Sequence, residues 1–326
     1  MNTYSLVNTN FPQKKGQDFY FIFKMIKLES LLLQPNDTLK EYVIKSSFDC
    51  QSRNQTYKAI IPNCEEEFFI KAQRYETPKE KNRIDSEIDI LNQLKENHNI
   101  LNHTDHIKQE FPIKLRSENG ETHEFKQVFM ISVMHFYKCY DLQKYYSEYV
   151  NKTNKKEINH QIFYKSLLIL KDIHSKRIVH HDIKPQNFLV RNNDPFDIVL
   201  TDFEFSVQLK EHEKTNSKCG TLHLMAPEIL NGDYHDMAVD IWSLGVMMYC
   251  FSRGVYPFGI LPEDNMDLVR KKLIKNKRPG FGKKFNRTLG NLLIKMLEID
   301  PKKRITVEDA LKHPYFEREN NLVNTE

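Results

Sequence analysis

Glycine is scarce in this sequence. Only 10 of its 326 residues are glycine, and only Gly16 and Gly120 precede residue 219. A typical composition of roughly 7% glycine would supply about 23. A glycine-rich loop, which brings bare backbone amides against phosphate groups, is therefore not expected in the first two hundred residues.

Cysteine is also sparse, and its spacing does not suggest metal binding. The five cysteines are odd in number, stand at least fourteen positions apart and form no C-x-x-C pair. Neither a disulfide framework nor a zinc site is predicted. A reducing, intracellular environment is expected.

Long apolar runs are absent, and neither sign of charge dominates. The N-terminus lacks a basic stretch followed by an apolar one, and Lys24 interrupts the apolar residues near it, so neither a leader nor a membrane span is predicted. The 48 Lys and Arg residues against 44 Asp and Glu leave a net charge of +4, and nucleic acid is not an expected partner. We expect a cytoplasmic protein, with membership of a cytoskeletal or other large assembly left open.

What is present indicates a large folded chain. With 40% hydrophobic and 28% charged residues, two domains or one two-lobed domain are expected. Residues 1–38 are interpreted as an N-terminal extension. Stretches that favour β structure alternate with polar turns from Leu39 to Gln73 and predict an antiparallel sheet.

The periodicity then changes along the chain. Apolar residues at three- and four-residue spacing predict a helix over residues 81–95. The polar segment 95–127 shows no clear period and is predicted to be a long loop or insert. Residues 128–134 return to a strand, and helical periodicity dominates from Leu142 to Phe316.

The most informative segment is IVHHDIKPQNFLV at residues 178–190, followed by IVLTDFEF at 198–205. Here the sequence resembles the eukaryotic protein kinase family, whose catalytic loop reads H-R-D-x-K-x-x-N and is followed by D-F-G. Further along come A-P-E at 226–228, DIWSLG at 240–245 and DPKKRIT ending at Thr306. The resemblance extends over residues 42–316. It implies an α+β protein kinase fold with two lobes, a small antiparallel β-rich N-lobe and a larger α-helical C-lobe.

The resemblance also implies roles for the matched residues. Asp182 would accept or orient the proton of the substrate hydroxyl, and Lys184 would neutralise charge on the transferred phosphoryl group. Asn187 and Asp202 would supply oxygen ligands to the magnesium that accompanies ATP. Lys184, together with Thr221 after Gly220, matches the serine/threonine-directed pattern.

The preceding lobe adds nucleotide-binding candidates. By the same resemblance, Lys71 would hold the ATP phosphates and Glu87 would be its helix partner. Met134 would be the gatekeeper, and Phe136 lies in the hinge segment whose backbone reads adenine. Asp141 is a candidate ribose contact.

Three positions depart from the family pattern. The glycine-loop positions are occupied by Asp49, Gln51 and Asn54, and Asp49 adds a negative charge where phosphates would lie. Glu204 replaces the glycine after Asp202-Phe203. His181 replaces an arginine that ordinarily receives an activation-loop phosphate, which a neutral imidazole cannot do. Control by phosphorylation at Ser206, Thr215 or Ser217 is therefore not expected.

Two further groups of residues concern structure and partners. Glu228 and Arg304 correspond to a buried ion pair, and Asp240 to the residue that braces the catalytic loop. The run Arg270–Lys284 holds eight Lys and Arg and no acidic residue. This run is either an ordinary solvated face or a docking face for an acidic partner or acidic substrate.

These observations give a domain order and two functional hypotheses. The expected order is an extension at 1–38, an N-lobe at 39–136, a C-lobe at 137–318 and a polar tail at 319–326. The first hypothesis is a serine/threonine protein kinase that uses ATP and Mg²⁺ on a protein substrate, with altered or weak activity. The alternative is a catalytically inactive pseudokinase that acts as a scaffold or structural subunit.

Overall fold

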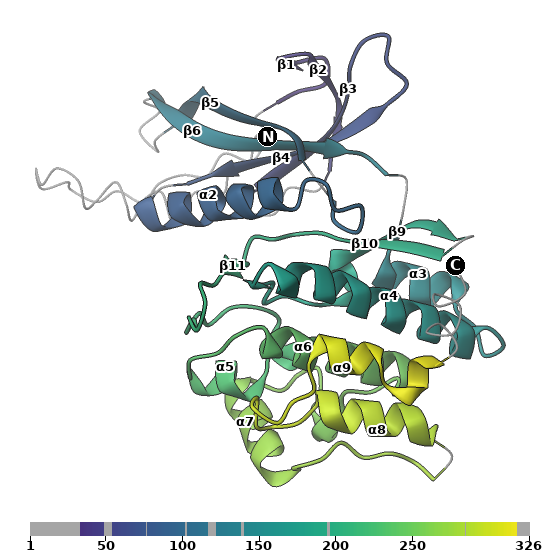
Figure 1. The fold of residues 1–326 in the computed structure, drawn as a ribbon. Coiled ribbons are helices and arrows are strands. Elements are labelled where there is room, and N and C mark those ends of the chain that lie inside the picture. The colour runs from purple at the N-terminus through teal and green to yellow at the C-terminus, as the bar shows by residue number, and fades with distance from the viewer. Residues whose placement is uncertain are drawn as a thin grey trace, which may run out of the picture. The chain divides into compact units, whose positions relative to one another are not determined.

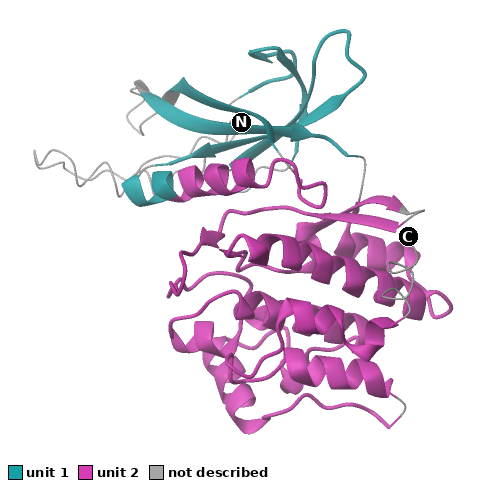
Figure 2. Cartoon of the chain, viewed as in Figure 1, with its two compact units in different colours: residues 1–82, 103–137 teal, residues 83–102, 138–326 magenta. Residues whose placement is uncertain are grey.

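The computed structural model describes residues 33–48, 54–75, 77–101, 103–116, 122–137, 140–193, 196–283 and 285–317 (Figure 1). The chain folds into two compact units (Figure 2). Unit 1 comprises residues up to Asn82 together with His103–Tyr137, and unit 2 comprises Arg83–Asn102 and the residues from Lys138 onward. Most of the predicted extension and tail lies outside the described residues, and the boundary proposed near residue 136 stays a prediction.

Unit 1 is built on one antiparallel sheet. Its six strands follow the order β1-β2-β3-β4-β6-β5, and their bounds are Thr38–Leu39 (β1), Tyr42–Ser47 (β2), Asn54–Ile60 (β3), Glu67–Arg74 (β4), His103–Arg116 (β5) and Thr122–His135 (β6). The strands alternate buried and more exposed residues, as the period-two geometry of a strand requires. Tyr57, Ile70 and Phe129 lie in the resulting core.

The predicted loop at 95–127 is wrong. Strand β5 and the first part of β6 occupy most of this segment, paired in register from His103 with Met134 to Arg116 with Thr122. β5 lies at the edge of the sheet and carries many polar residues, so its hydrophobic signal is weak. Its pairing with β6, rather than its own composition, makes it a strand.

Helix α2 spans Pro78–Gln93, and its residues from Arg83 onward belong to unit 2. The segment after the helix explains this assignment. Leu101 N donates to Leu200 O, and Leu200 N donates to Asn99 O, both at 2.9 Å. The side-chain amides of Asn97 and Asn99 donate to the same oxygen of Asp172. These bonds attach the segment that follows α2 to the rest of unit 2.

Unit 2 is mainly helical, as predicted. Its helices are α3 Leu142–Tyr149, α4 Lys155–Ser175, α5 Pro227–Asn231, α6 Ala238–Arg253, α7 Met266–Lys275, α8 Arg287–Met296 and α9 Val307–Leu311. Short strands stand among them: β7 Tyr140–Asp141, β8 Ile178–Val179, β9 Phe188–Asn193, β10 Phe196–Leu200 and β11 Val207–Gln208. β9 and β10 form a hairpin that β7 extends, and β8 pairs with β11.

Helix α6 lies at the centre of unit 2 (Figure 1). Nearly all of its residues are buried, which is typical of a helix that other elements cover on every side. It ends at Gly254, whose left-handed conformation closes the last turn. Asp240, in the first turn of α6, is thereby held inside the unit. Across the described ranges, no helix is both long and apolar enough to span a bilayer.

Candidate active site

Asp182 is the centre of a network of hydrogen bonds in unit 2. It is buried, and its Oδ2 accepts from Lys184 Nζ at 2.6 Å and from Asn187 Nδ2 at 3.2 Å. Its Oδ1 accepts from the hydroxyl of Thr221 at 2.7 Å. The four residues come from the loop after β8, the short 3₁₀ helix Pro185–Asn187 and the segment that precedes α5. The structure thus brings Asp182, Lys184 and Asn187 together.

Thr221 depends on the glycine before it. Gly220 has a φ of +107°, and a Cβ atom there would lie 2.3 Å from the carbonyl oxygen of His181. Only glycine fits this close approach of two backbones. Gly220, one of the few glycines in the chain, therefore allows the backbone to place Thr221 against Asp182.

Asn187 and Asp202 are joined through the backbone. Thr201 N donates to Asn187 O at 2.8 Å. Asp202 is the next residue in the chain and is therefore held near Asn187. Asp202 has a φ of +63°, a conformation that non-glycine residues seldom adopt. The Nδ2 of Asn187 donates to both the carbonyl and the carboxylate of Asp182, so its Oδ1 points away from that residue.

Asp240 braces the catalytic loop from helix α6, as predicted. Its two carboxylate oxygens accept from the backbone amides of His180 at 2.8 Å and His181 at 2.9 Å. His174 Nε2 donates to the same carboxylate at 3.1 Å. Burial by itself would raise the pKa of Asp240, but the hydrogen bond from His174 and the neighbouring histidines lower it. The carboxylate therefore remains ionised and rigidly held.

His180 connects the loop to the segment that follows β10. Its Nδ1 accepts from Asp182 N, and its Nε2 donates to Thr201 O. Its ring meets that of Phe203 edge to face, with 4.9 Å between centroids. A neutral histidine with its proton on Nε2 satisfies both hydrogen bonds.

His181, which replaces the arginine of the family pattern, is fully engaged inside unit 2. Its Nδ1 lies 3.0 Å from Phe205 O, and its Nε2 lies 3.0 Å from His235 Nε2. Burial lowers the pKa of His181, whereas the charge of Asp240 raises it. The side chain is therefore a buried structural link and not an exposed cation.

Glu204, which replaces the glycine after Asp202-Phe203, forms an ion pair with Arg83 of helix α2. The guanidinium of Arg83 also lies over the ring of Phe205, 5.5 Å from its centroid. Arg83 therefore balances the negative charge that Glu204 adds two residues after Asp202. Glu87, the predicted partner of Lys71, lies one turn further along α2 and is 4% exposed.

The nucleotide-binding candidates of unit 1 lie on β4, on β6 and just after β6. Lys71 of β4 is paired in register with Ser132 of β6, and the buried Met134 is two residues further along β6. Phe136 N donates to Glu67 O at 2.7 Å. The ring of Phe136 stacks on that of Phe48, with 5.8 Å between centroids.

The remaining candidates are partly described. Asp141 is the N-cap of α3, and its Oδ1 accepts from Lys144 N at 2.8 Å. Asn54 begins β3, whereas Asp49 and Gln51 lie outside the described residues. Among the described residues, no group of three or more His, Cys, Asp and Glu side chains could hold a metal ion. A cation here would rely on Asn187 and Asp202 together with oxygens from its ligand.

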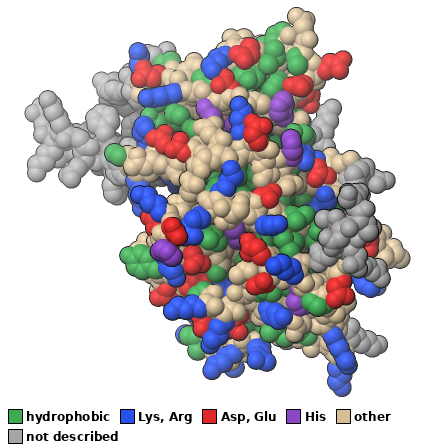
Figure 3. All heavy atoms as spheres, viewed as in Figure 1, with side chains coloured by type: hydrophobic (Ala, Val, Ile, Leu, Met, Phe, Trp, Pro, Cys, Tyr) green, Lys and Arg blue, Asp and Glu red, His purple; other side chains and the backbone are tan. Residues whose placement is uncertain are grey.

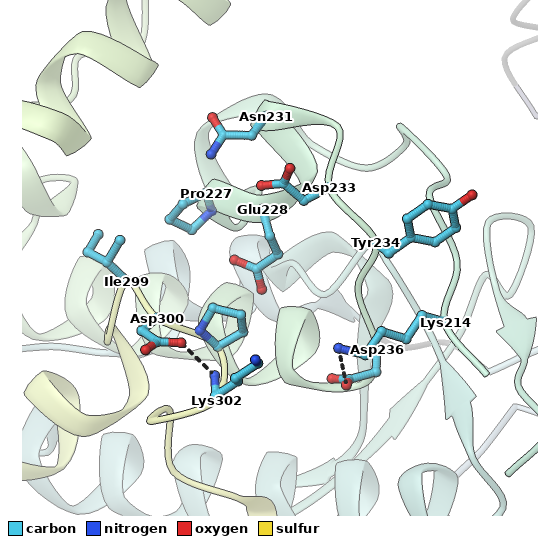
Figure 4. Close-up of a pocket in the computed structure, with 11 residues that line it drawn as sticks. Lys214, Pro227, Glu228, Asn231, Asp233, Tyr234, Asp236, Ile299, Asp300 and Lys302 are labelled. Atoms are coloured by element: carbon cyan, nitrogen blue, oxygen red, sulfur yellow. Dashed lines mark hydrogen bonds and ion pairs between the residues drawn. The ribbon is translucent and has the colours of Figure 1, made fainter. Parts of the chain in front are cut away.

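A separate cavity of about 350 Å³ lies beside helix α5 (Figure 4). Glu228 lines it, and the two oxygens of Glu228 accept from Arg304 at 2.7 and 3.0 Å. This is the predicted buried ion pair. Lys214 and Asp236, 3.7 Å apart, lie on another side of the cavity. No residue predicted to act in catalysis lines this cavity.

Sequence reasoning missed three residues that hold the site: His174, His235 and Arg83. Arg83 stands four positions before Glu87, so helical spacing places both on one face of α2 and could have indicated it. His174 and His235 match no motif position. Only their contacts with Asp240 and His181 reveal them.

The sheet of unit 1 and the helices of unit 2 make up the α+β, two-lobed fold of a protein kinase. The chain belongs to the protein kinase family: the protein kinase domain matches residues 52–316. An Aurora kinase of Debaryomyces hansenii is 36% identical over 155 residues, which are 47% of this chain and 36% of that protein.

Two other similar proteins are also protein kinases. Ribosomal protein S6 kinase alpha-1 of Rattus norvegicus is 33% identical over 156 residues, 46% of this chain and 21% of that kinase. The phosphorylase b kinase gamma catalytic chain, liver/testis isoform, of Mus musculus is 35% identical over 153 residues, 45% of this chain and 37% of that protein. The matched region is thus well under half the length of each of these three relatives.

Proposed function

We propose that this protein transfers the γ-phosphoryl group of ATP to a serine or threonine hydroxyl of a protein substrate. The observation that carries the proposal is the network around Asp182, a buried carboxylate bonded to Lys184, Asn187 and Thr221. A carboxylate held in this way can receive a proton from a hydroxyl. Kinase relatives of the serine/threonine type support the choice of acceptor.

The reaction assigns a separate task to each group. The hydroxyl oxygen of the substrate forms a bond to the γ-phosphorus while the bond to the β-phosphate oxygen breaks, and ADP leaves. Asp182 orients the hydroxyl and receives its proton. Lys184 places positive charge near the transferred group, and it is held 2.6 Å from Asp182.

Asn187 and Asp202 fit a magnesium ion by the chemistry of their donors. Asn187 donates through Nδ2 to Asp182, which leaves its Oδ1 for a cation, and Asp202 contributes a carboxylate. Magnesium prefers such oxygen ligands and keeps phosphate or water oxygens in its other positions. When bound, the ion supplies positive charge that neutralises the ATP phosphates.

By family resemblance, Lys71 and its partner Glu87 would bind the ATP phosphates. Met134 and Phe136 would lie at the adenine, and Asp141 would contact the ribose. The missing glycines predict weaker phosphate binding than in relatives that retain them, because side chains hinder the approach of backbone amides. The proposed activity is therefore slow or weak. We propose a cytoplasmic location on the same basis of family and composition.

The alternative function is that of an inactive scaffold, and the pairing of Glu204 with Arg83 favours it. That ion pair restrains the segment after Asp202, where glycine would permit movement. A scaffold would retain the fold and its partners without transferring phosphate.

Incorporation of radiolabelled phosphate from Mg-ATP into a generic protein substrate tests the proposal. Asp182→Asn is the matched control, because it keeps the size of the side chain and removes its charge. Activity that disappears in the variant supports catalysis. Absence of transfer by the folded wild-type protein overturns it.

A thermal shift with Mg-ATP separates binding from turnover. A ligand at about 100 times its dissociation constant stabilises the folded state by about 2.7 kcal/mol. Stabilisation without transfer would identify a scaffold that binds nucleotide. If the protein shows neither stabilisation nor transfer, only the function of a scaffold that does not bind nucleotide remains.

A further inference from the structure

The basic run Arg270–Lys284 contains two kinds of cation: those paired within the fold and those exposed to solvent. Lys272 and Arg270 are used by the fold itself. Lys272 Nζ lies 2.6 Å from a carboxylate oxygen of the buried Asp264, and Arg270 donates to the carbonyl of Leu230. These two side chains fasten helix α7 to its surroundings.

The other described cations of the run point to solvent. Lys271 and Lys275 lie on the exposed side of α7, Lys277 and Arg278 follow shortly after it, and Lys283 is exposed further along the run. Within the described part of the chain, none of these five has an ion-pair partner. Figure 3 shows Lys and Arg side chains gathered at the end of unit 2 where Figure 1 draws α7. Lys284, the last residue of the run, lies outside the described residues.

Apolar side chains stand among these cations. Ile274 is 76% exposed and Leu268 is 42% exposed, and both belong to α7. The helix already packs its inner face through the buried Val269 and Leu273. At 100° per residue, Leu268, Lys271, Ile274 and Lys275 therefore lie on the opposite, outer half of the helix. We call these four residues, with Lys277 and Arg278, the α7 surface.

We propose that the α7 surface binds an acidic protein segment that carries apolar side chains. The cations without internal partners complement acidic groups, and Ile274 and Leu268 would be buried by apolar ones. None of the six residues belongs to the proposed catalytic site. Docking here is therefore independent of phosphate transfer and suits a substrate or a scaffold partner equally.

The pattern on the helix disfavours other occupants. A helix that lies on a membrane presents one broad apolar face, but the apolar face of α7 is already packed inside unit 2. Ile274 and Leu268 lie on either side of the lysines and do not form a second such face. Single-stranded nucleic acid is bound by stacking on aromatic rings, and the α7 surface contains none.

Binding of synthetic peptides to the full chain tests the proposal by fluorescence anisotropy. The probe is a labelled helical peptide with leucines along one face and glutamates elsewhere. Two companion peptides replace either the leucines by serine or the glutamates by lysine. The proposal requires that the first peptide binds more tightly than either companion, and that its affinity falls as salt screens the exposed charges.

Matched variants locate the binding site. Lys271→Glu with Lys275→Glu is expected to weaken binding by at least about tenfold, and Ile274→Ser by about tenfold. Lys171→Glu with Lys312→Glu makes the same change in net charge at exposed positions elsewhere in unit 2 and is expected to leave binding unchanged. Asp182→Asn is also expected to bind normally, which separates docking from catalysis.

Three results would overturn the proposal. One is absence of binding by the acidic apolar peptide. Another is equal weakening by the variants of the α7 surface and by the control pair, because net charge alone would then explain it. The third is binding to vesicles that contain anionic lipid without binding to the peptide, which would assign the surface to a membrane.

Discussion

His181 and His235 face each other through their Nε2 atoms, 3.0 Å apart. The Nδ1 atom of each ring lies 3.0 Å from a backbone carbonyl oxygen, of Phe205 and Asp233 respectively. A carbonyl only accepts, so each Nδ1 carries a hydrogen. A hydrogen bond between the two Nε2 atoms therefore requires one further proton on one of the rings. Burial lowers the pKa of His181, and the charge of Asp240 raises it.

The contact between these rings connects the catalytic loop, without a phosphate, to the activation segment, by which we mean residues 202–226 between β10 and α5. The backbone of His235 exchanges two hydrogen bonds with Thr215, at 2.8 and 3.0 Å. The link therefore runs from the catalytic loop through two rings to Thr215. His181 is therefore not available to bind a phosphate on Thr215.

We therefore expect Thr215→Ala and Ser217→Ala to keep at least about half of the wild-type rate of phosphate transfer. The two hydroxyls are half-buried and lie 3.0 Å apart, so removing either one loses a hydrogen bond worth about 1 kcal/mol of stability. Transfer rates before and after phosphatase treatment provide the measurement. A loss of activity that follows dephosphorylation would contradict the expectation.

Glu204→Gln is expected to loosen the start of the activation segment. It removes the ion pair with Arg83, whose side chain is partly exposed, so the free energy of unfolding should fall by only about 0.2–1 kcal/mol. Hydrogen exchange at residues 203–206 and in α2 should become faster. Glu211→Gln, at an exposed residue of the same segment, is the control. Unchanged exchange in Glu204→Gln would show that the ion pair does not restrain the segment.

Glu228→Gln is expected to destabilise unit 2 strongly. It leaves the buried guanidinium of Arg304 without its negative partner, and loss of one member of a buried pair costs about 3–5 kcal/mol. Denaturant unfolding measures the change. Glu263→Gln, at an exposed carboxylate, should cost about 0.5 kcal/mol or less. Similar losses in both variants would contradict the assignment.

Stability should fall on acidification because of His103. Burial, His106 and Lys71 lower the pKa of His103 from 6.5 to about 3. His103 therefore stays neutral in the folded state while the unfolded chain binds a proton below about pH 6.5. The stability that depends on neutral His103 is fully present above pH 6.5 and is lost progressively as the pH falls toward 3.

The His103→Leu variant isolates this contribution. Its melting temperature should depend less on pH between about 7 and 4 than that of the wild-type protein. Thermal unfolding at several pH values makes the comparison. The same dependence in both proteins would show that other groups cause the loss of stability.

Much of the candidate site could be predicted because its parts are close in sequence. Asp182, Lys184 and Asn187 lie on one loop and a short helix, and their mutual hydrogen bonds are local. Periodicity likewise indicated the helical unit and the strands β3 and β4. The edge strand β5 could not be predicted in this way, because its polar residues are stabilised by pairing with β6.

The sequence by itself determined the kinase family, the order of the catalytic motifs and the departures at His181 and Glu204. Only the tertiary structure decided what these two replacements do. The partner of Glu204 is 121 positions away, and that of His181 is 54 positions away. A motif records residue types along the chain, whereas ion pairs and ring contacts form between side chains that folding brings within a few ångströms.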